Sequence, residues 1–175
     1  MAMKVFSDNT VASAADANEY FVNTKYAVKP SNTTRTGTSV SDDPDLVLNV
    51  GTNRTFQLEL IAPFTGASGA GGLKFAFSGP AGAQLFGYWQ LTTAQGSSFG
   101  PVQGGTYDGG VSQNLGTTQN ISALTGVTLA DTLAVRGWLQ TGGTAGNFTF
   151  RWSLNSASGN VTALAGSAMF LRRVS

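Results

Sequence analysis

The stretch Phe148–Leu154 (FTFRWSL) places large apolar side chains on alternate positions, with small or charged side chains between them. In an extended strand, successive side chains point to opposite faces, so Phe148, Phe150 and Trp152 share one face while Arg151 lies on the other. Burying such rings contributes roughly 1.5–3 kcal/mol each. The stretch therefore predicts a β-strand whose aromatic face forms one wall of a core.

The same period of two runs through most of the chain after residue 26. It predicts strands at residues 45–50, 55–62, 73–77, 83–90, 127–129, 132–140, 147–154 and 167–174. Turn residues at Gly51–Arg54 suit a hairpin between the first two. About eight strands with polar connections predict an all-β fold, an antiparallel β-sandwich or barrel, and a β-sandwich of jelly-roll topology is favoured. Residues 91–124, rich in Gly, Ser, Thr and Gln, are expected to form surface loops or short edge strands.

One short N-terminal helix is predicted at Ser13–Asn23, where a capping serine is followed three residues later by Asp16. Its apolar side carries Tyr20 and Phe21. A helix this short is not stable alone, so this side must dock on its own domain, the favoured reading, or on another protein. The chain thus divides into an N-terminal arm at residues 1–25 and a sandwich domain at residues 26–175.

The composition excludes several classes of function. The 175 residues fit one domain, and 11% charged residues with a net charge of +1 argue against nucleic-acid binding. There are no cysteines and no histidines, so disulfides, thiol nucleophiles, serine–histidine triads and zinc sites of those ligands are excluded. We expect neither an enzyme nor a cofactor. No stretch reaches transmembrane length and no secretory signal is recognisable, so a soluble protein without membrane insertion is expected.

The densest acidic segment is Ser41–Asp45 (SDDPD). Its carboxylates could ligate calcium, but the segment lacks the spacing and the glycine of a calcium loop. A turn before a strand, in which the Asp side chains cap local amides, explains it better. No metal site is expected.

Arginines and an aromatic residue recur near the face opposite the core. Arg136 and Trp138 alternate in one predicted strand, Arg151 faces away from the rings, and Arg172 lies in the last strand. These residues could bind an anion, or they could lie at a subunit interface, where arginine and aromatic residues are enriched. The subunit interface is favoured, with Arg136, Trp138 and Arg151 on one shared surface.

A possible ligand loop comprises Trp89, Tyr107 and Asp108, since aromatic and acidic side chains together suit a sugar. A solvated loop explains the region better, because polar loops are common on any surface.

Several segments together resemble a family of small virion accessory proteins of tailed bacteriophages, especially those of actinobacteria. The segments are Ala15–Thr24, Lys29–Thr36, Asp43–Leu46, Leu58–Ile61, Gly72–Phe75, Phe150–Trp152 and Ala165–Val174. They cover most of the chain outside residues 91–124, and they are structural rather than catalytic in character.

The resemblance implies a non-enzymatic structural protein with a tumour-necrosis-factor-like β-sandwich. Such a protein would be made in the host cytoplasm and mounted on the virion surface, as a capsid decoration protein or a minor tail protein. Its partners would be itself, as a homotrimer, and other capsid or tail proteins, with Tyr20 and Phe21 in the attachment segment. The alternative is a receptor- or glycan-binding module of a phage tail that recognises a host-surface glycan.

Overall fold

The computed structural model describes residues 24–66, 72–92, 106–111, 115, 118–121, 131–156 and 159–174. All regular secondary structure in these residues is β-strand, and every strand pairing is antiparallel, which confirms the all-β prediction. The helix expected at Ser13–Asn23, with Tyr20 and Phe21, lies outside the described residues. The first strand begins at Thr24, just before the expected domain boundary.

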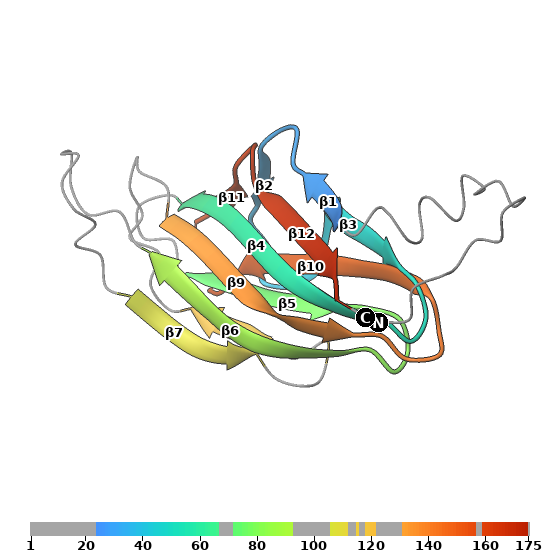
Figure 1. Cartoon of the computed structure of the whole chain (residues 1–175). Helices are drawn as coiled ribbons and strands as arrows, with labels where there is room; N and C mark the ends of the chain where they lie inside the picture. The colour runs from blue at the N-terminus through green and yellow to red at the C-terminus, as the bar shows by residue number, and fades with distance from the viewer. Residues whose placement is uncertain are drawn as a thin grey trace, which may run out of the picture.

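The strands form two sheets, seen one behind the other in Figure 1. The eight-stranded sheet has the order β1 (Thr24–Val28), β12 (Ala168–Arg173), β4 (Thr55–Gly66), β9 (Asp131–Gln140), β6 (Gln84–Thr92), β7 (Thr106–Val111). Two further short strands belong to this sheet: β11 (Val161–Ala163) pairs with the end of β4, and β2 (Thr33–Arg35) pairs with β11. The four-stranded sheet has the order β3 (Ser41–Val50), β10 (Gly146–Leu154), β5 (Leu73–Ser78), β8 (Gln119–Ile121).

The core lies between the two sheets, where the aromatic face of β10 meets the inner face of the larger sheet. The ring of Trp152 packs edge-on against Phe64 of β4 at 5.4 Å between centroids, and Phe75 of β5 meets Trp89 of β6 at 5.7 Å. Phe148 and Phe150 are fully buried with Trp152, as the alternation in β10 predicts. The arrangement is therefore a sandwich of two antiparallel sheets.

The predicted hairpin between the strands around Gly51–Arg54 is wrong, because β3 and β4 belong to different sheets. The connection instead turns a corner between the sheets, with Asn53 in the left-handed region at φ 50°. It is held by the β9–β10 connection: Asn53 N donates to Gly142 O at 2.8 Å, and Arg54 N donates to Thr141 Oγ1 at 2.9 Å. A turn-rich segment predicts a reversal of direction, but not the sheet in which the chain continues.

The strands β6 and β9 approach each other unusually closely at a pair of facing glycines. Gly87 and Gly137 are direct partners in the register. A Cβ added to Gly137 would lie 2.2 Å from Phe86 O, and one added to Gly87 would lie 2.2 Å from Arg136 O. Only glycine fits at this crossing, because any side chain would collide with the neighbouring backbone.

Candidate functional site

The outer face of the eight-stranded sheet is the surface that gathers the most distinctive exposed side chains. Alternation in five adjacent strands sends every second residue of each strand outward. We define the outer face as the outward residues of β1, β12, β4, β9 and β6 that lie in three cross-strand rows. The rows are Thr24, Arg172, Gln57, Trp138 and Phe86; Tyr26, Phe170, Glu59, Arg136 and Tyr88; and Val28, Ala168, Ile61, Ala134 and Gln90.

Large apolar side chains on this face are open to solvent. Tyr26 is 68% exposed, Tyr88 52% and Trp138 49%, and Val28 and Ile61 are also exposed. Single exposed apolar residues are common on protein surfaces, but a contiguous group of them marks an interaction surface.

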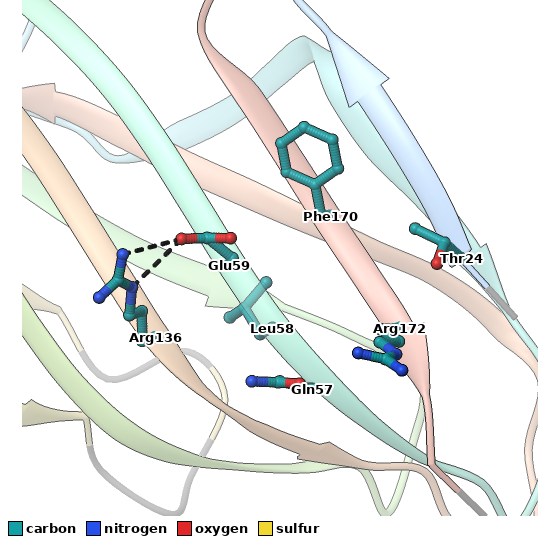
Figure 2. A pocket seen from close by; sticks show the side chains of 7 residues that line it. All are labelled: Thr24, Gln57, Leu58, Glu59, Arg136, Phe170 and Arg172. Atoms are coloured by element: carbon teal, nitrogen blue, oxygen red, sulfur yellow. Dashed lines mark hydrogen bonds and ion pairs between the residues drawn. The ribbon is translucent and has the colours of Figure 1, made fainter.

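The charged centre of the outer face is an ion pair between neighbouring strands. Arg136 of β9 donates from Nη2 and Nε to Glu59 Oε1 of β4, at 3.0 and 3.2 Å (Figure 2). Hydrogen bonding to Tyr88, and then to Glu59, raises the pKa of Arg136 above its ordinary value. The Arg136 guanidinium is therefore held by Glu59 but stays exposed to solvent.

A shallow hollow of about 480 Å³ lies beside this ion pair, over β4, β9 and β12 (Figure 2). It is lined by Thr24, Gln57, Leu58, Glu59, Arg136, Phe170 and Arg172. One end of the hollow carries the Arg136–Glu59 pair and the other carries Arg172, which has no carboxylate within salt-bridge distance in the part of the chain that the structure describes. The hollow can therefore accept a carboxylate or a polar side chain from a binding partner.

Arg151 does not lie on this surface, so the expectation of one surface shared with Arg136 and Trp138 is wrong. It belongs to β10 in the other sheet, and its Nε lies 2.7 Å from Asp42 Oδ1 while Nη2 donates to Val40 O at 3.3 Å. Strand alternation places Arg151 away from the core, but each sheet of a sandwich has its own outward side. Arg151 fastens the segment that leads into β3.

The three candidate ligand residues lie in two neighbouring strands and not in one loop, and β7 is an edge strand, one of the two forms expected for residues 91–124. Trp89 lies in β6 with its ring in the core, only 7% exposed, and therefore cannot present a sugar-stacking surface. Tyr107 and Asp108 belong to strand β7, opposite Leu91 and Gln90 of β6. The alternation in β6 could have shown that Trp89 is buried. Leu85, Trp89 and Leu91 lie on the core side of the strand, whereas Tyr88 lies on the other side.

A buried polar cluster at one end of the sandwich was not anticipated. The Lys29 side chain is fully buried, and its Nζ lies 3.2 Å from both carboxylate oxygens of Asp43 and 2.7 Å from Asp45 Oδ2. Trp152 Nε1 also donates to Asp43 Oδ2, at 2.8 Å. A buried charge requires such partners, since an unpaired one would carry a large desolvation penalty.

The acidic segment lies within β3, where the pairing with β10 shifts register, and not in a turn before the strand as expected. The predicted capping of local amides by an Asp side chain is present. Asp43 Oδ1 accepts from Asp45 N at 3.0 Å and from Leu46 N at 3.1 Å. Burial opposes ionisation of Asp43, but the hydrogen bonds from Trp152 and Asp45 N and the charge of Lys29 outweigh it and lower the pKa. Asp43 is thus a buried carboxylate that joins β1, β3 and β10.

Arg35 completes the cluster from β2. Its guanidinium lies 4.2 Å from the centroid of the Trp152 ring and donates to the carbonyl oxygens of Ser41, Asp42 and Trp152. Burial lowers its pKa, with the charges of Asp43 and Asp42 opposing the shift. Arg35 thus stacks on the Trp152 ring, and its role is to hold β2, β3 and β10 together.

The described residues hold neither a metal-ligand cluster nor a membrane-spanning helix. No group of three or more acidic, cysteine or histidine side chains in the described ranges is arranged to hold a metal ion. No helix within those ranges is long and apolar enough to span a bilayer.

Comparisons with known proteins give little. No protein-family model and no curated protein sequence matches the chain. Among solved structures, the chain is matched to a chain of "Structure of infectious bursal disease virus Gx strain", with 10% identity and a TM-score of 0.19. The match covers 100% of this chain and 42% of the other. A likeness this weak carries no argument about fold or function.

Proposed function

We propose that the chain is a non-enzymatic structural protein of a bacteriophage virion, an oligomeric accessory protein on the particle surface that serves as a capsid decoration or minor tail protein. The outer face of the eight-stranded sheet supports this proposal most directly. It combines exposed aromatic and aliphatic side chains with arginine and a single carboxylate, the composition of a protein–protein interface. The family resemblance of the sequence supplies the virion context.

We further infer that the sandwich is a jelly roll, related to the tumour-necrosis-factor-like folds. The strand orders support this inference. The inference uses eight strands, which in chain order are β1, β3, β4, β5, β8, β9, β10 and β12. In space they are ordered β1-β12-β4-β9 within the larger sheet and β3-β10-β5-β8 within the smaller sheet. This is the order of two interleaved Greek keys, with β6 and β7 inserted between β5 and β8 as an extension of the larger sheet.

The proposed partners are further copies of the chain, as the homotrimer that the resemblance implies, and neighbouring capsid or tail proteins reached through the arm that contains Tyr20 and Phe21. The proposed location is the virion surface, after synthesis in the host cytoplasm. A glycan-binding module is less well supported, because the ring of Trp89 is buried.

The test is to locate the protein in purified phage particles. Immunogold labelling, together with protein mass spectrometry of particles from a density gradient, is expected to find it on the outside of intact heads or tails in many copies. A protein that is made during infection but stays in the soluble lysate fraction would refute a virion role.

A further inference from the structure

We propose that the outer face of the eight-stranded sheet is covered by a second copy of this chain. The proposal rests on the proposed function, which places many copies on one particle, and it names the surface through which those copies meet. It concerns the three cross-strand rows defined above and no residue of the smaller sheet.

The distribution of exposed apolar side chains singles out this face. Among the described residues, six large apolar side chains are exposed, and five of them lie on the outer face: Tyr26, Val28, Ile61, Tyr88 and Trp138. The sixth, Val174, follows β12. Apart from the half-buried Val47, the outward residues of the smaller sheet are instead small or polar, as in Asn49, Asn147 and Lys74. A patch confined to one of two available faces marks that face as an interface.

The chemistry of the patch indicates a protein as the occupant. Val28 and Ile61 are β-branched aliphatic residues, which give a sugar no ring to stack on but pack well against protein side chains. No lysine lies in the three rows, whereas aromatic residues and arginine are frequent. Lysine depletion with aromatic and arginine enrichment is the signature of a protein interface core.

The charges of the face are complementary to one another, which favours a second copy over an unrelated partner. Both hydrogen bonds from Arg136 to Glu59 end at Oε1, and Glu59 Oε2 accepts no hydrogen bond from the described residues. Arg172 stands at the opposite end of the same hollow, with no carboxylate partner there. Arg172 of one copy can therefore pair with Glu59 of the next, and every copy offers both groups, in a closed dimer or a closed trimer.

The experiment measures the mass of the wild-type protein by size-exclusion chromatography with light scattering and compares two variants. Trp138→Glu places a charge in the middle of the face, and Asn147→Glu places the same charge on the exposed surface of β10. We expect two or more chains per particle for the wild type and for Asn147→Glu. For Trp138→Glu we expect a single chain, or at least a tenfold weaker association constant, with an unchanged circular dichroism spectrum.

A second measurement covers the case in which Trp138→Glu does not fold. The photo-crosslinker benzoylphenylalanine replaces Tyr26, the most exposed aromatic residue of the face, and in a matched control it replaces Asn49 of the smaller sheet. We expect light to join two copies of the chain from position 26 and not from position 49.

A wild-type protein that stays monomeric and forms no self-crosslink from position 26 would overturn the proposal. So would a monomer that binds a glycan array through Trp138, since the occupant would then be a carbohydrate. These outcomes are separate from the virion role, because particle labelling is scored independently of self-association.

Discussion

At the scale of single residues, the most consequential side chain is the carboxylate of Asp43. It accepts hydrogen bonds from Lys29 Nζ, Trp152 Nε1 and two backbone amides, so it links a lysine after β1, a bulge in β3 and the central aromatic residue of β10. Without cysteines in the chain, no disulfide can hold these strands, and a buried ionic cluster takes that place.

We predict that Asp43→Asn strongly destabilises the fold. The substitution keeps the shape of the side chain but leaves the buried ammonium of Lys29 with only Asp45 as a charged partner. The expected loss is about 3 kcal/mol in the free energy of unfolding, measured by urea denaturation. The control is Asp42→Asn, which removes an exposed ion pair with Arg151 and should cost less than about 1 kcal/mol. Equal losses for the two variants would contradict a structural role of the buried cluster.

The lowered pKa of Asp43 predicts how stability depends on pH. A carboxyl group with a lower pKa in the folded state than in the unfolded state stabilises the fold above its unfolded pKa of about 3.9. That contribution disappears as the pH falls through the folded-state value. Thermal melting between neutral pH and pH 3 should therefore show a steeper acid loss for the wild type than for Asp43→Asn. Parallel curves would show that Asp43 does not titrate as proposed.

The sequence predicts the cap in this cluster but not the rest of it. An Asp-Asp-Pro-Asp run favours a turn whose side chains bind nearby amides, and Asp43 does so. The partners Lys29 and Trp152 are 14 and 109 residues away in the chain. Nothing in a local pattern joins such residues, because their proximity depends on which strands pair.

At the scale of elements, the longer strands are well predicted, but the short strands β1, β2 and β11 are missed and strand partners are not predicted. The strand expected at residues 127–129 lies outside the described residues. The alternation of FTFRWSL correctly places its rings in the core, and the strands near 55–62, 73–77 and 132–140 are found as β4, β5 and β9. Alternation describes one strand at a time, so it assigns a residue to the inner or outer side without naming the sheet. That gap explains both the wrong hairpin at Gly51–Arg54 and the misplacement of Arg151.

We predict that the facing glycines of β6 and β9, Gly87 and Gly137, tolerate no side chain. Gly137→Ala would place a methyl group against Phe86 O, so the two strands must separate, at a cost of about 2 kcal/mol or more. Gly143→Ala is the matched control, because a Cβ there meets nothing within 4 Å. The midpoint of chemical unfolding reports the difference, and a stable Gly137→Ala variant would refute the close approach.

At the scale of the whole molecule, the two sheets differ in their outward sides. The larger sheet presents the aromatic outer face, whereas β10 of the smaller sheet is partly covered by its own chain. Ser153 Oγ donates to Thr38 O at 3.2 Å, and Leu154 N donates to Gly37 O at 3.2 Å. Five of the six exposed large apolar side chains of the described residues therefore lie on one side of the molecule.

We predict that particle attachment and self-association can be separated. If Tyr20 and Phe21 contact the particle and not their own domain, replacing both with Ala should leave the melting temperature and the oligomeric mass unchanged. The same variant should fail to bind purified particles that lack the protein, scored by co-sedimentation, while wild-type protein binds. Full binding by the double variant would remove these residues from the attachment role.

Thr24 and Arg172 are paired neighbours in adjacent strands, so the first and last strands of the domain run side by side. The two ends of the described domain therefore lie close together in space. Such a domain suits circular permutation and insertion into a surface loop of another protein, since the incoming and outgoing chains need only one short gap between them. A peptide displayed after Val174 would emerge beside the start of β1.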